Sequence, residues 1–253
     1  MTIIYDGSFE GLLGAVGYAL KTGVEDVVIT TEENYAPSLF DEPIVLATNN
    51  ELVDRMKTAI VDLIKKPGLE SLWKFTLSEK SEVPQVLFSV LGYMFRSKKN
   101  ILGDFADPKV LFLQKTLKQI SRERHRMTAF VRFKKASNGV YFAEIEPDFD
   151  VLPLISKHFA QRYADQSWVI YDKMRDYGLF YDLKNVHVVT LTLDAENSSL
   201  PAKTLLEWDE EEKEFQTLWK DYFHSTHIPA RKNKKLHLQH VPKRYWKYLT
   251  EKQ

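Results

Sequence analysis

Residues 158 to 182 bring a histidine, two arginines and several acidic residues together in one short stretch of sequence. His158 and Asp172 are suited to general acid and base chemistry, because imidazole titrates near neutral pH and needs a carboxylate to fix its tautomer and orientation. A histidine and a carboxylate can also be bonded for purely structural reasons, which is the interpretation that we favour. The two residues are therefore weak candidates for catalysis, and we assign a catalytic role to neither.

The two arginines of this stretch have a different chemistry. Arg162 and Arg175 could grip a phosphate or a carboxylate, because a guanidinium offers parallel N–H donors in a fixed plane. The alternative is an internal ion pair with Asp172, Asp176 or Asp182, which lie close by in the sequence. The sequence leaves both interpretations open.

Metal and redox chemistry have little support in the sequence. The chain contains no cysteine, which excludes a thiolate nucleophile, a cysteine-bound iron–sulfur cluster and a cysteine-rich zinc site. Two histidine pairs, at 224 and 227 and at 237 and 240, have a spacing of three residues. No carboxylate accompanies them at a recognised metal spacing, and lysines stand between them. We therefore expect neither a metal nor a cofactor.

Charge is balanced over the whole chain but distributed unevenly. Its 35 lysines and arginines equal its 35 aspartates and glutamates. Residues 107–135 nevertheless hold nine basic and two acidic residues, and residues 225–253 hold eight and one. Such segments can present a local positive face to a polyanion. The alternative is that the glutamates at 210–212 cover one of them internally.

The first basic segment is predicted to be a helix that begins at Asp107 and Pro108, a typical capping residue and first-turn proline. At 100° per residue, its apolar positions fall on one side and four cations fall on the other. The apolar positions are Val110, Leu113, Leu117, Ile120 and Met127, and the cations are Lys115, Lys118, Arg122 and Arg126. Cations repeated along one face can track a nucleic-acid backbone, although a merely solvated face is the alternative.

The second basic segment mixes cations with aromatic residues. Arg231, Lys234 and their neighbours could follow a sugar-phosphate path while Trp246 and nearby rings stack on exposed bases. The alternative is that Tyr245, Trp246 and Leu249 dock the C-terminus into the core. Both interpretations can hold together if the lysines remain in water.

The elements that would position these residues predict an α+β fold. An N-terminal α/β subdomain is expected over 1–82, followed by a basic α+β domain of helices and antiparallel strands over 83–253. In the first, strands are expected at 3–5, 27–29 and 44–47, and helices are expected at 9–20 and from 49 onward. Its four glycines at 7, 11, 14 and 17 fit neither a dinucleotide nor a P-loop fingerprint, which favours close helix packing.

In the second domain, strand signals surround one strong turn signal. Asn138-Gly139 predicts a hairpin between strands at 128–133 and 140–145, because such turns require positive φ. A helix with core spacing should follow residues 147–150. Further strands are expected at 168–171, 179–181 and 186–193, and a helix carrying Phe215 and Trp219 follows the acidic segment.

Three stretches of the chain resemble a known bacterial family of probable DNA metabolism proteins. They are HRMTAFVRF at 125–133, HFAQRYADQSWVIYDKMRDYGLFYD at 158–182 and HIPARKNKKLHLQHVPKRYWKYL at 227–249. Members of this family are typically encoded beside a radical SAM protein with a proposed role in DNA modification or repair, and some are fused to a domain similar to uracil-DNA glycosylases. The resemblance implies a DNA context and a radical SAM partner.

The resemblance also points to particular residues, without giving any of them a catalytic role. These are Arg132, His158, Phe159, Arg162, Trp168, Asp172, Arg175, Arg231, Asn233, Pro242 and Trp246. Because this chain lacks cysteine, the cluster of any radical SAM chemistry would have to lie in the partner.

A cytoplasmic protein without membrane contact is expected, because the apolar runs at 11–20 and 83–95 are too short to span a bilayer. The function predicted is that of a DNA-binding accessory protein in repair or modification. The predicted contacts are Lys115, Lys118, Arg122, Arg126, Arg132, Arg162, Arg175, Arg231, Asn233, Lys234 and Trp246. Two alternatives stand: an enzyme that acts on a damaged base or nucleotide through His158 and Asp172, and a protein-interaction module.

Overall fold

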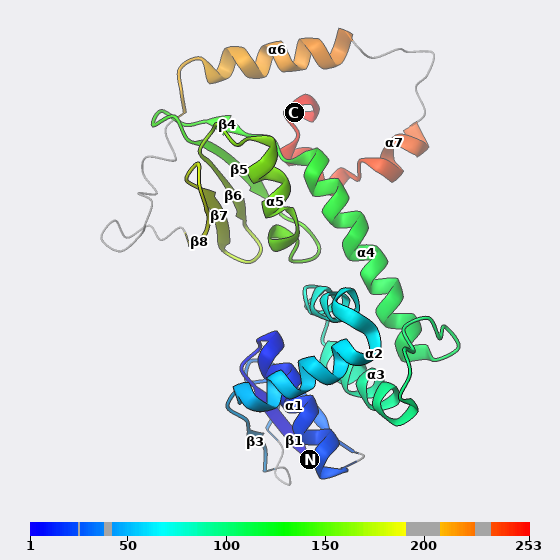
Figure 1. Cartoon of the computed structure of the whole chain (residues 1–253). Coiled ribbons are helices and arrows are strands. Elements are labelled where there is room, and N and C mark those ends of the chain that lie inside the picture. Colours follow the sequence, from blue (N-terminus) through cyan, green and yellow to red (C-terminus); the bar gives the residue numbers. More distant parts are fainter. Residues whose placement is uncertain (25, 38–41, 191–207, 226–233) are drawn as a thin grey trace. The chain divides into compact units, whose positions relative to one another are not determined.

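The computed structural model describes residues 1–24, 26–37, 42–190, 208–225 and 234–253, and the side chains of 213, 222–225, 234, 235 and 237 lie outside that description. The chain forms two compact units, Met1–Ile120 and Ser121–Gln253, which are described separately (Figure 1). The domain boundary predicted at residue 82 therefore falls inside the first unit, between two of its helices. The reason is that the helix after the boundary shares the hydrophobic core of the residues before it.

The first unit is a small parallel sheet packed against helices. Its sheet has the order β2-β1-β3, and both pairings are parallel, as the alternating pattern of the sequence predicts. Residues of the first and third helices share one core cluster. The elements are β1 (Thr2–Tyr5), α1 (Phe9–Thr22), β2 (Val28–Thr31), β3 (Ile44–Val45), α2 (Asn50–Thr76) and α3 (Val83–Ser97).

The glycines of α1 allow close contacts. The Asp6 carboxylate, at the end of β1, accepts hydrogen bonds from the Ser8 amide and hydroxyl at 2.9 and 2.6 Å. It lies so close to the first turn of α1 that a Cβ on Gly11 would be 2.1 Å from Asp6 Oδ1. Further along, a Cβ on Gly17 would be 3.0 Å from the Met56 side chain of α2. Close packing, and not a phosphate loop, explains these two glycines.

The helix α4 (Pro108–Phe130) begins as predicted, since Asp107 Oδ1 accepts hydrogen bonds from the amides of Lys109 and Val110 at 2.8 and 2.9 Å. Its end differs from the prediction of a strand at 128–133. The helix continues to Phe130, and the Val131 amide still bonds the Met127 carbonyl at 3.3 Å. Met127 and Val131 are both buried, so the helical core pattern overrides the β-prone residues between them.

The second unit contains a mixed sheet in the order β4-β5-β6-β7-β8. All neighbouring pairs are antiparallel except β5 and β6, which are parallel and are connected through α5. The predicted turn is present between β4 and β5, with Gly139 at φ +82°. The elements are β4 (Lys134–Lys135), β5 (Tyr141–Ile145), α5 (Leu152–Arg162), β6 (Trp168–Asp172), β7 (Tyr177–Tyr181) and β8 (Val186–Val189). The predicted α+β class is confirmed.

Helix α5 packs on the sheet through aromatic side chains. Phe159 of α5 lies 6.1 Å from the fully buried Trp168 of β6, and Phe133, just before β4, lies 5.8 Å from Phe159 (ring centroids). Figure 1 shows α5 lying against the sheet. The central strand β6 is buried at all five positions, as expected for a strand that is covered on both faces.

The C-terminal residues complete the second unit. They form α6 (Glu212–Ser225), α7 (Lys234–His240) and two short 3-10 helices, η3 (Lys243–Tyr248) and η4 (Thr250–Lys252). Tyr245 and Leu249 are buried and Trp246 is half-buried, as the alternative of a C-terminus docked into the core implies. Within the described parts of the chain, no helix combines the length and the apolar character needed to cross a membrane.

Candidate nucleic-acid interface

The charged face of α4 is exposed as its sequence predicts. Val110, Leu113, Ile120 and Met127 are buried, while Lys115, Lys118 and Arg122 are exposed and Arg126 is half-buried. Lys115 and Lys118 belong to the first compact unit, and Arg122 and Arg126 to the second. The predicted periodicity of α4 is confirmed.

Glu123, the one acidic residue between Lys109 and Lys135 in the sequence, is buried in the second unit, with a side-chain exposure of 2%. Its carboxylate lies 3.5 Å from Arg126 Nη1 and 3.2 Å from Arg244 Nη2, and it accepts a hydrogen bond from the Asp148 amide at 3.0 Å. It also accepts a hydrogen bond from the Tyr245 hydroxyl. A buried carboxylate of this kind needs these partners, because a charge without them would be costly to bury.

This carboxylate joins the two basic segments of the chain. Arg126 belongs to the first segment and Arg244 to the second, and each makes an ion pair with Glu123. Arg126 Nη2 also donates to the Gln239 carbonyl of α7 at 3.4 Å, so α7 lies beside the C-terminal half of α4 (Figure 1). Burial and the nearby Glu123 carboxylate raise the pKa of the Tyr245 hydroxyl, which therefore stays protonated and remains a donor.

Several cations around this junction remain in water. Arg122 and Lys243 are exposed, and the Arg244 side chain keeps 42% of its surface accessible. Arg244 also pairs with Asp148 at 2.6 Å. Of the predicted contacts in the tail, Arg231 and Asn233 lie outside the described residues. Lys234 begins α7, but its side chain is likewise outside the description.

Arg132 is engaged in an internal ion pair. Its Nη2 and Nε atoms lie 2.7 and 3.2 Å from the two oxygens of Glu251, and its guanidinium lies 5.6 Å from the ring centre of Trp219. The Trp219 indole also donates to Glu251 at 3.0 Å. Burial would raise the pKa of Glu251, but the hydrogen bonds from Arg132 and Trp219 outweigh it and hold the pKa below its ordinary value. Arg132 therefore anchors α6 and the C-terminus to the end of α4.

Arg175 has the internal partner that was one of its two predicted alternatives. Its Nη1 lies 2.8 Å from Oδ2 of Asp172, which is completely buried, and also donates to the Pro147 carbonyl at 3.1 Å. The other Asp172 oxygen accepts from the Met174 amide at 2.9 Å. This arrangement closes the turn between β6 and β7.

His158 and Arg162 lie on α5 and are both exposed. The His158 ring makes an edge contact with Phe159 at 5.1 Å, and no hydrogen bond links it to Asp172 in the described structure. Arg162 likewise makes no ion pair with a described residue. The structure thus brings Asp172 to Arg175 and leaves His158 without the orienting carboxylate that acid and base catalysis would need. Within the described part of the chain, no group of three histidine, aspartate or glutamate side chains lies close enough together to hold a metal ion.

The acidic segment contacts the far end of the first basic segment. Lys135 Nζ lies 2.9 Å from Asp209, and the Lys135 amide donates to Glu212 at 2.9 Å. Over the part of the chain that is described, this cover reaches Lys135 and forms no ion pair with the four cations of α4. The predicted alternative, in which the acidic segment neutralises a basic segment, therefore applies to Lys135 and not to the four cations of α4.

A cavity of about 600 Å³ lies in the second unit beneath α6. Aromatic side chains from separate elements line it, namely Phe133, Tyr141, Tyr163, Phe215 and Trp219. The sequence did not identify this group, because its members are distant in the chain and share no spacing. The available signal was the set of apolar positions in α6, but in the sequence their spacing indicates only a helix that packs on a core. The structure shows that Phe215, Leu218 and Trp219 are exposed instead.

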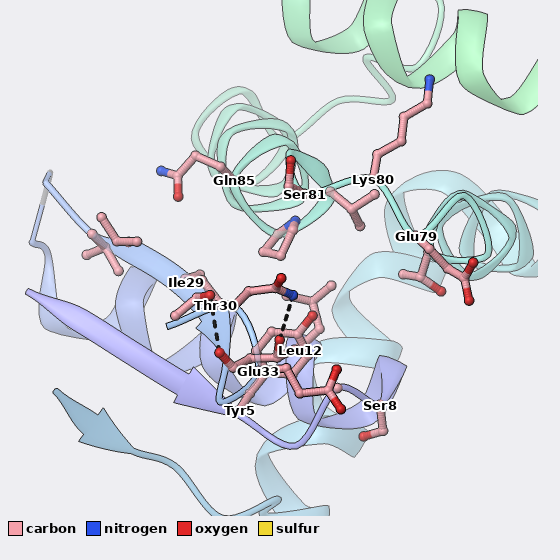
Figure 2. A pocket seen from close by; sticks show the side chains of 18 of the residues that line it. Tyr5, Ser8, Leu12, Ile29, Thr30, Glu33, Glu79, Lys80, Ser81 and Gln85 are labelled. Carbon is pink, nitrogen blue, oxygen red and sulfur yellow. Dashed lines mark hydrogen bonds between the residues drawn. The ribbon is translucent and has the colours of Figure 1, made fainter. Parts of the chain in front are cut away.

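A larger cavity of about 930 Å³ lies in the first unit, beside β2 and the start of α3 (Figure 2). Its charged lining consists of Asp26, Glu33 and Glu79 against the single cation Lys80. Figure 2 shows Lys80 directed away from the cavity, and its Nζ bonds Thr116 and Gln119 at 3.3 and 3.1 Å. An acidic lining opposes a polyanion, so this cavity is not a candidate for nucleic-acid binding.

A known protein family matches more than half of the chain. The model of the family DUF4130, described as a domain of unknown function, matches residues 81–251, which run from α3 into η4. No curated protein matches the chain.

Proposed function

The chain belongs to the DUF4130 family, and we propose that it is a DNA-binding accessory protein that acts in DNA repair or modification together with a radical SAM partner. The observation that carries the proposal is the contact between two basic segments that lie more than 100 residues apart in the sequence. Arg126 of the first and Arg244 of the second share the buried Glu123 carboxylate. Arg122 and Lys243, which stand close to them in the sequence, are exposed cations of the same two segments, and we take them as parts of one binding surface.

This surface suits the backbone of a nucleic acid. Helix α4 offers cations at intervals of three or four residues, which is the spacing of one helix face. Lysine and arginine contacts of this kind position a protein on phosphates and release bound counterions, and they do not read sequence. The Glu123 junction fixes the tail against α4, so that cations of both segments are preorganised before DNA binds.

The resemblance of the sequence to proteins encoded beside a radical SAM protein supports the second part of the proposal. This chain has no cysteine and its described residues form no metal-binding cluster, so it offers no thiolate ligands for an iron–sulfur cluster. In the proposed complex, the partner supplies the chemistry and this chain holds the DNA.

Charge reversal tests DNA binding. We expect the double variant Arg122→Glu/Lys243→Glu to bind labelled duplex and single-stranded oligonucleotides roughly tenfold or more weakly in fluorescence anisotropy. The slope of log K against log salt should fall by about 1.4 to 1.8, since each lost phosphate contact contributes about 0.7 to 0.9. The control is Lys99→Glu/Lys184→Glu, which reverses two exposed lysines elsewhere and changes the net charge by the same amount. At a given salt concentration, its affinity should equal that of the wild type once the effect of the changed net charge is subtracted.

Two results would contradict the proposal. One is a wild-type chain that retains neither oligonucleotide at 20 mM salt. The other is a double variant whose affinity and salt slope equal those of the control pair, with unchanged circular dichroism. The partner is tested separately, by co-expression of the chain with a radical SAM protein encoded beside its gene and co-purification after nuclease treatment. Failure to co-purify would remove the partner from the proposal and leave the DNA interface standing.

A further inference from the structure

The cavity beneath α6 lies at the end of the helix that carries the proposed DNA-binding face. Ala129, at the last turn of α4, and Val131, just after it, line the cavity. Arg122 precedes Ala129 by seven residues, which places the two on nearly the same side of α4 and about 10 Å apart along its axis. A strand held at Arg122 therefore needs to follow the helix for only two turns to reach the cavity.

The walls of the cavity are aromatic and firmly held. The Tyr163 ring packs edge-on against Phe133, with ring centroids 5.3 Å apart. Trp219 is fixed by its hydrogen bond to Glu251 and by the Arg132 guanidinium over its ring. Phe215 also lines the cavity while 57% of it is exposed, so its ring is accessible from solvent. Flat, rigid rings of this kind are the surfaces on which bases stack.

Polar groups in the lining are available for hydrogen bonds. The hydroxyls of Tyr141 and Tyr163 and the side-chain amide of Gln166 make no hydrogen bond to any described residue, although all three side chains are partly buried. A glutamine amide can donate and accept at once, which matches the edge of a nucleobase. The lining thus combines apolar stacking surface with a few polar groups, as small-ligand sites of 300 to 1,000 Å³ do.

The charges of the lining favour a neutral ligand group. Its two cations, Arg132 and Lys135, are paired with Glu251 and Asp209 at 2.7 and 2.9 Å. Its remaining charged residue, Glu212, is bonded to the Lys135 amide and to Gln216. A phosphate would find no unpaired cation here, because Arg132 and Lys135 are both paired. A base carries no charge and therefore does not need a free cation.

From this geometry we infer that the cavity receives one unpaired base of the bound DNA strand, which stacks on its aromatic walls. The inference rests on the proposed DNA-binding function and adds the class of ligand to it. The base is taken from a single-stranded or unpaired position, because a base inside a duplex cannot reach a lined cavity.

Fluorescence of 2-aminopurine tests the inference directly. A 12-nucleotide single strand with one central 2-aminopurine is titrated with the full chain at 50 mM salt. We expect quenching of the 2-aminopurine on binding, because the stacked analogue loses fluorescence. The Phe215→Ala variant should lose this quenching and bind roughly 5- to 150-fold more weakly, which corresponds to about 1–3 kcal/mol for one stacked base.

The matched control is Leu218→Ala. Leu218 lies on the same helix and is 63% exposed, but it does not line the cavity, so this variant should quench and bind like the wild type. A second variant, Gln166→Ala, removes a polar group of the lining while it keeps every aromatic wall, and it should also weaken binding. The salt slope should stay unchanged in all three variants, because none removes a phosphate contact.

The outcomes separate the cavity from the DNA-binding function. DNA retention by the wild type without quenching, with Phe215→Ala and Gln166→Ala binding equally well, would overturn the inference and leave the proposed function intact. Quenching of free 2-aminopurine riboside without binding of the oligonucleotide would overturn the assignment to a DNA strand. Absence of any oligonucleotide binding would overturn both.

Discussion

Glu123 of α4 accepts a hydrogen bond from the hydroxyl of Tyr245, a residue 122 positions further along the chain. The bond joins the helix of the first basic segment to the 3-10 helix of the second, and both side chains are almost completely buried. It therefore anchors the C-terminal segment to the second unit. The same bond places Arg244, next to Tyr245, against the carboxylate.

We predict that Tyr245→Phe lowers the free energy of unfolding of the second unit by about 1–3 kcal/mol, because a buried carboxylate loses one of its donors. Urea unfolding followed by tryptophan fluorescence measures this, since four of the five tryptophans, at 168, 208, 219 and 246, lie in this unit. Tyr141→Phe is the control: its hydroxyl has no described hydrogen bond, and the change should stay within about 0.5 kcal/mol. Equal stability of Tyr245→Phe and the wild type would show that the tail is not anchored by this bond.

Local patterns in the sequence were sufficient to predict most of the elements. The spacing of Val110, Leu113 and Ile120 gave the buried face of α4, and Asn138-Gly139 gave the turn between β4 and β5. The end of α4 was predicted wrongly, because Thr128 to Phe133 resembles a strand by composition. Contacts of Met127 and Val131 with the core decide the conformation there, and such contacts are not visible in local propensity.

The candidate site was less predictable, because its pairings are long-range. Arg175 and its partner Asp172 are three residues apart, and their ion pair was one of two predicted alternatives. Arg132 and Glu251 are 119 residues apart, and no sequence pattern identifies them as partners. The aromatic cavity has the same origin, since its walls come from α6, from β5 and from the residues just after α4 and just after α5.

The alternative of catalysis by His158 and Asp172 predicts that the two residues are energetically coupled. The structure instead gives Asp172 to Arg175 and to the Met174 amide, while His158 is exposed. We expect Asp172→Asn to destabilise the second unit by about 3–5 kcal/mol, because it removes the partner of a largely buried guanidinium. His158→Ala should change its stability by less than about 0.5 kcal/mol.

A double-mutant cycle decides the matter. The effects of Asp172→Asn and His158→Ala should add within about 0.5 kcal/mol in urea unfolding, as for residues without a shared partner. The Arg175→Met variant serves as the positive control, since its effect should not add to that of Asp172→Asn. A coupling of more than 1 kcal/mol between His158 and Asp172 would instead favour the enzymatic alternative.

Acid stability depends in part on the turn between β7 and β8. Asp182 accepts hydrogen bonds from the Asn185 and Lys184 amides at 2.7 and 2.9 Å and lies 2.8 Å from the His187 ring. The amide of Asn185 and the ring of His187 contribute most, and the pKa of Asp182 falls from 3.8 to about 2. Because the folded pKa lies below the unfolded one, the stabilising contribution is complete above about pH 4 and is lost as the pH falls toward 2.

The variant Asp182→Asn isolates this contribution. The asparagine oxygen can still accept hydrogen bonds from both backbone amides, but the side chain carries no charge. We expect the wild type to be the more stable of the two at pH 6, with a difference that shrinks steadily as the pH is lowered from 4 toward 2. Urea unfolding curves at pH 6, 4, 3.5 and 3 measure the difference. Lys184→Gln is the control, because it changes a neighbouring charge without touching the carboxylate, and its offset from the wild type should not vary over this range. A difference for Asp182→Asn that is constant from pH 6 to 3 would show that this carboxylate titrates at the same pH in both states.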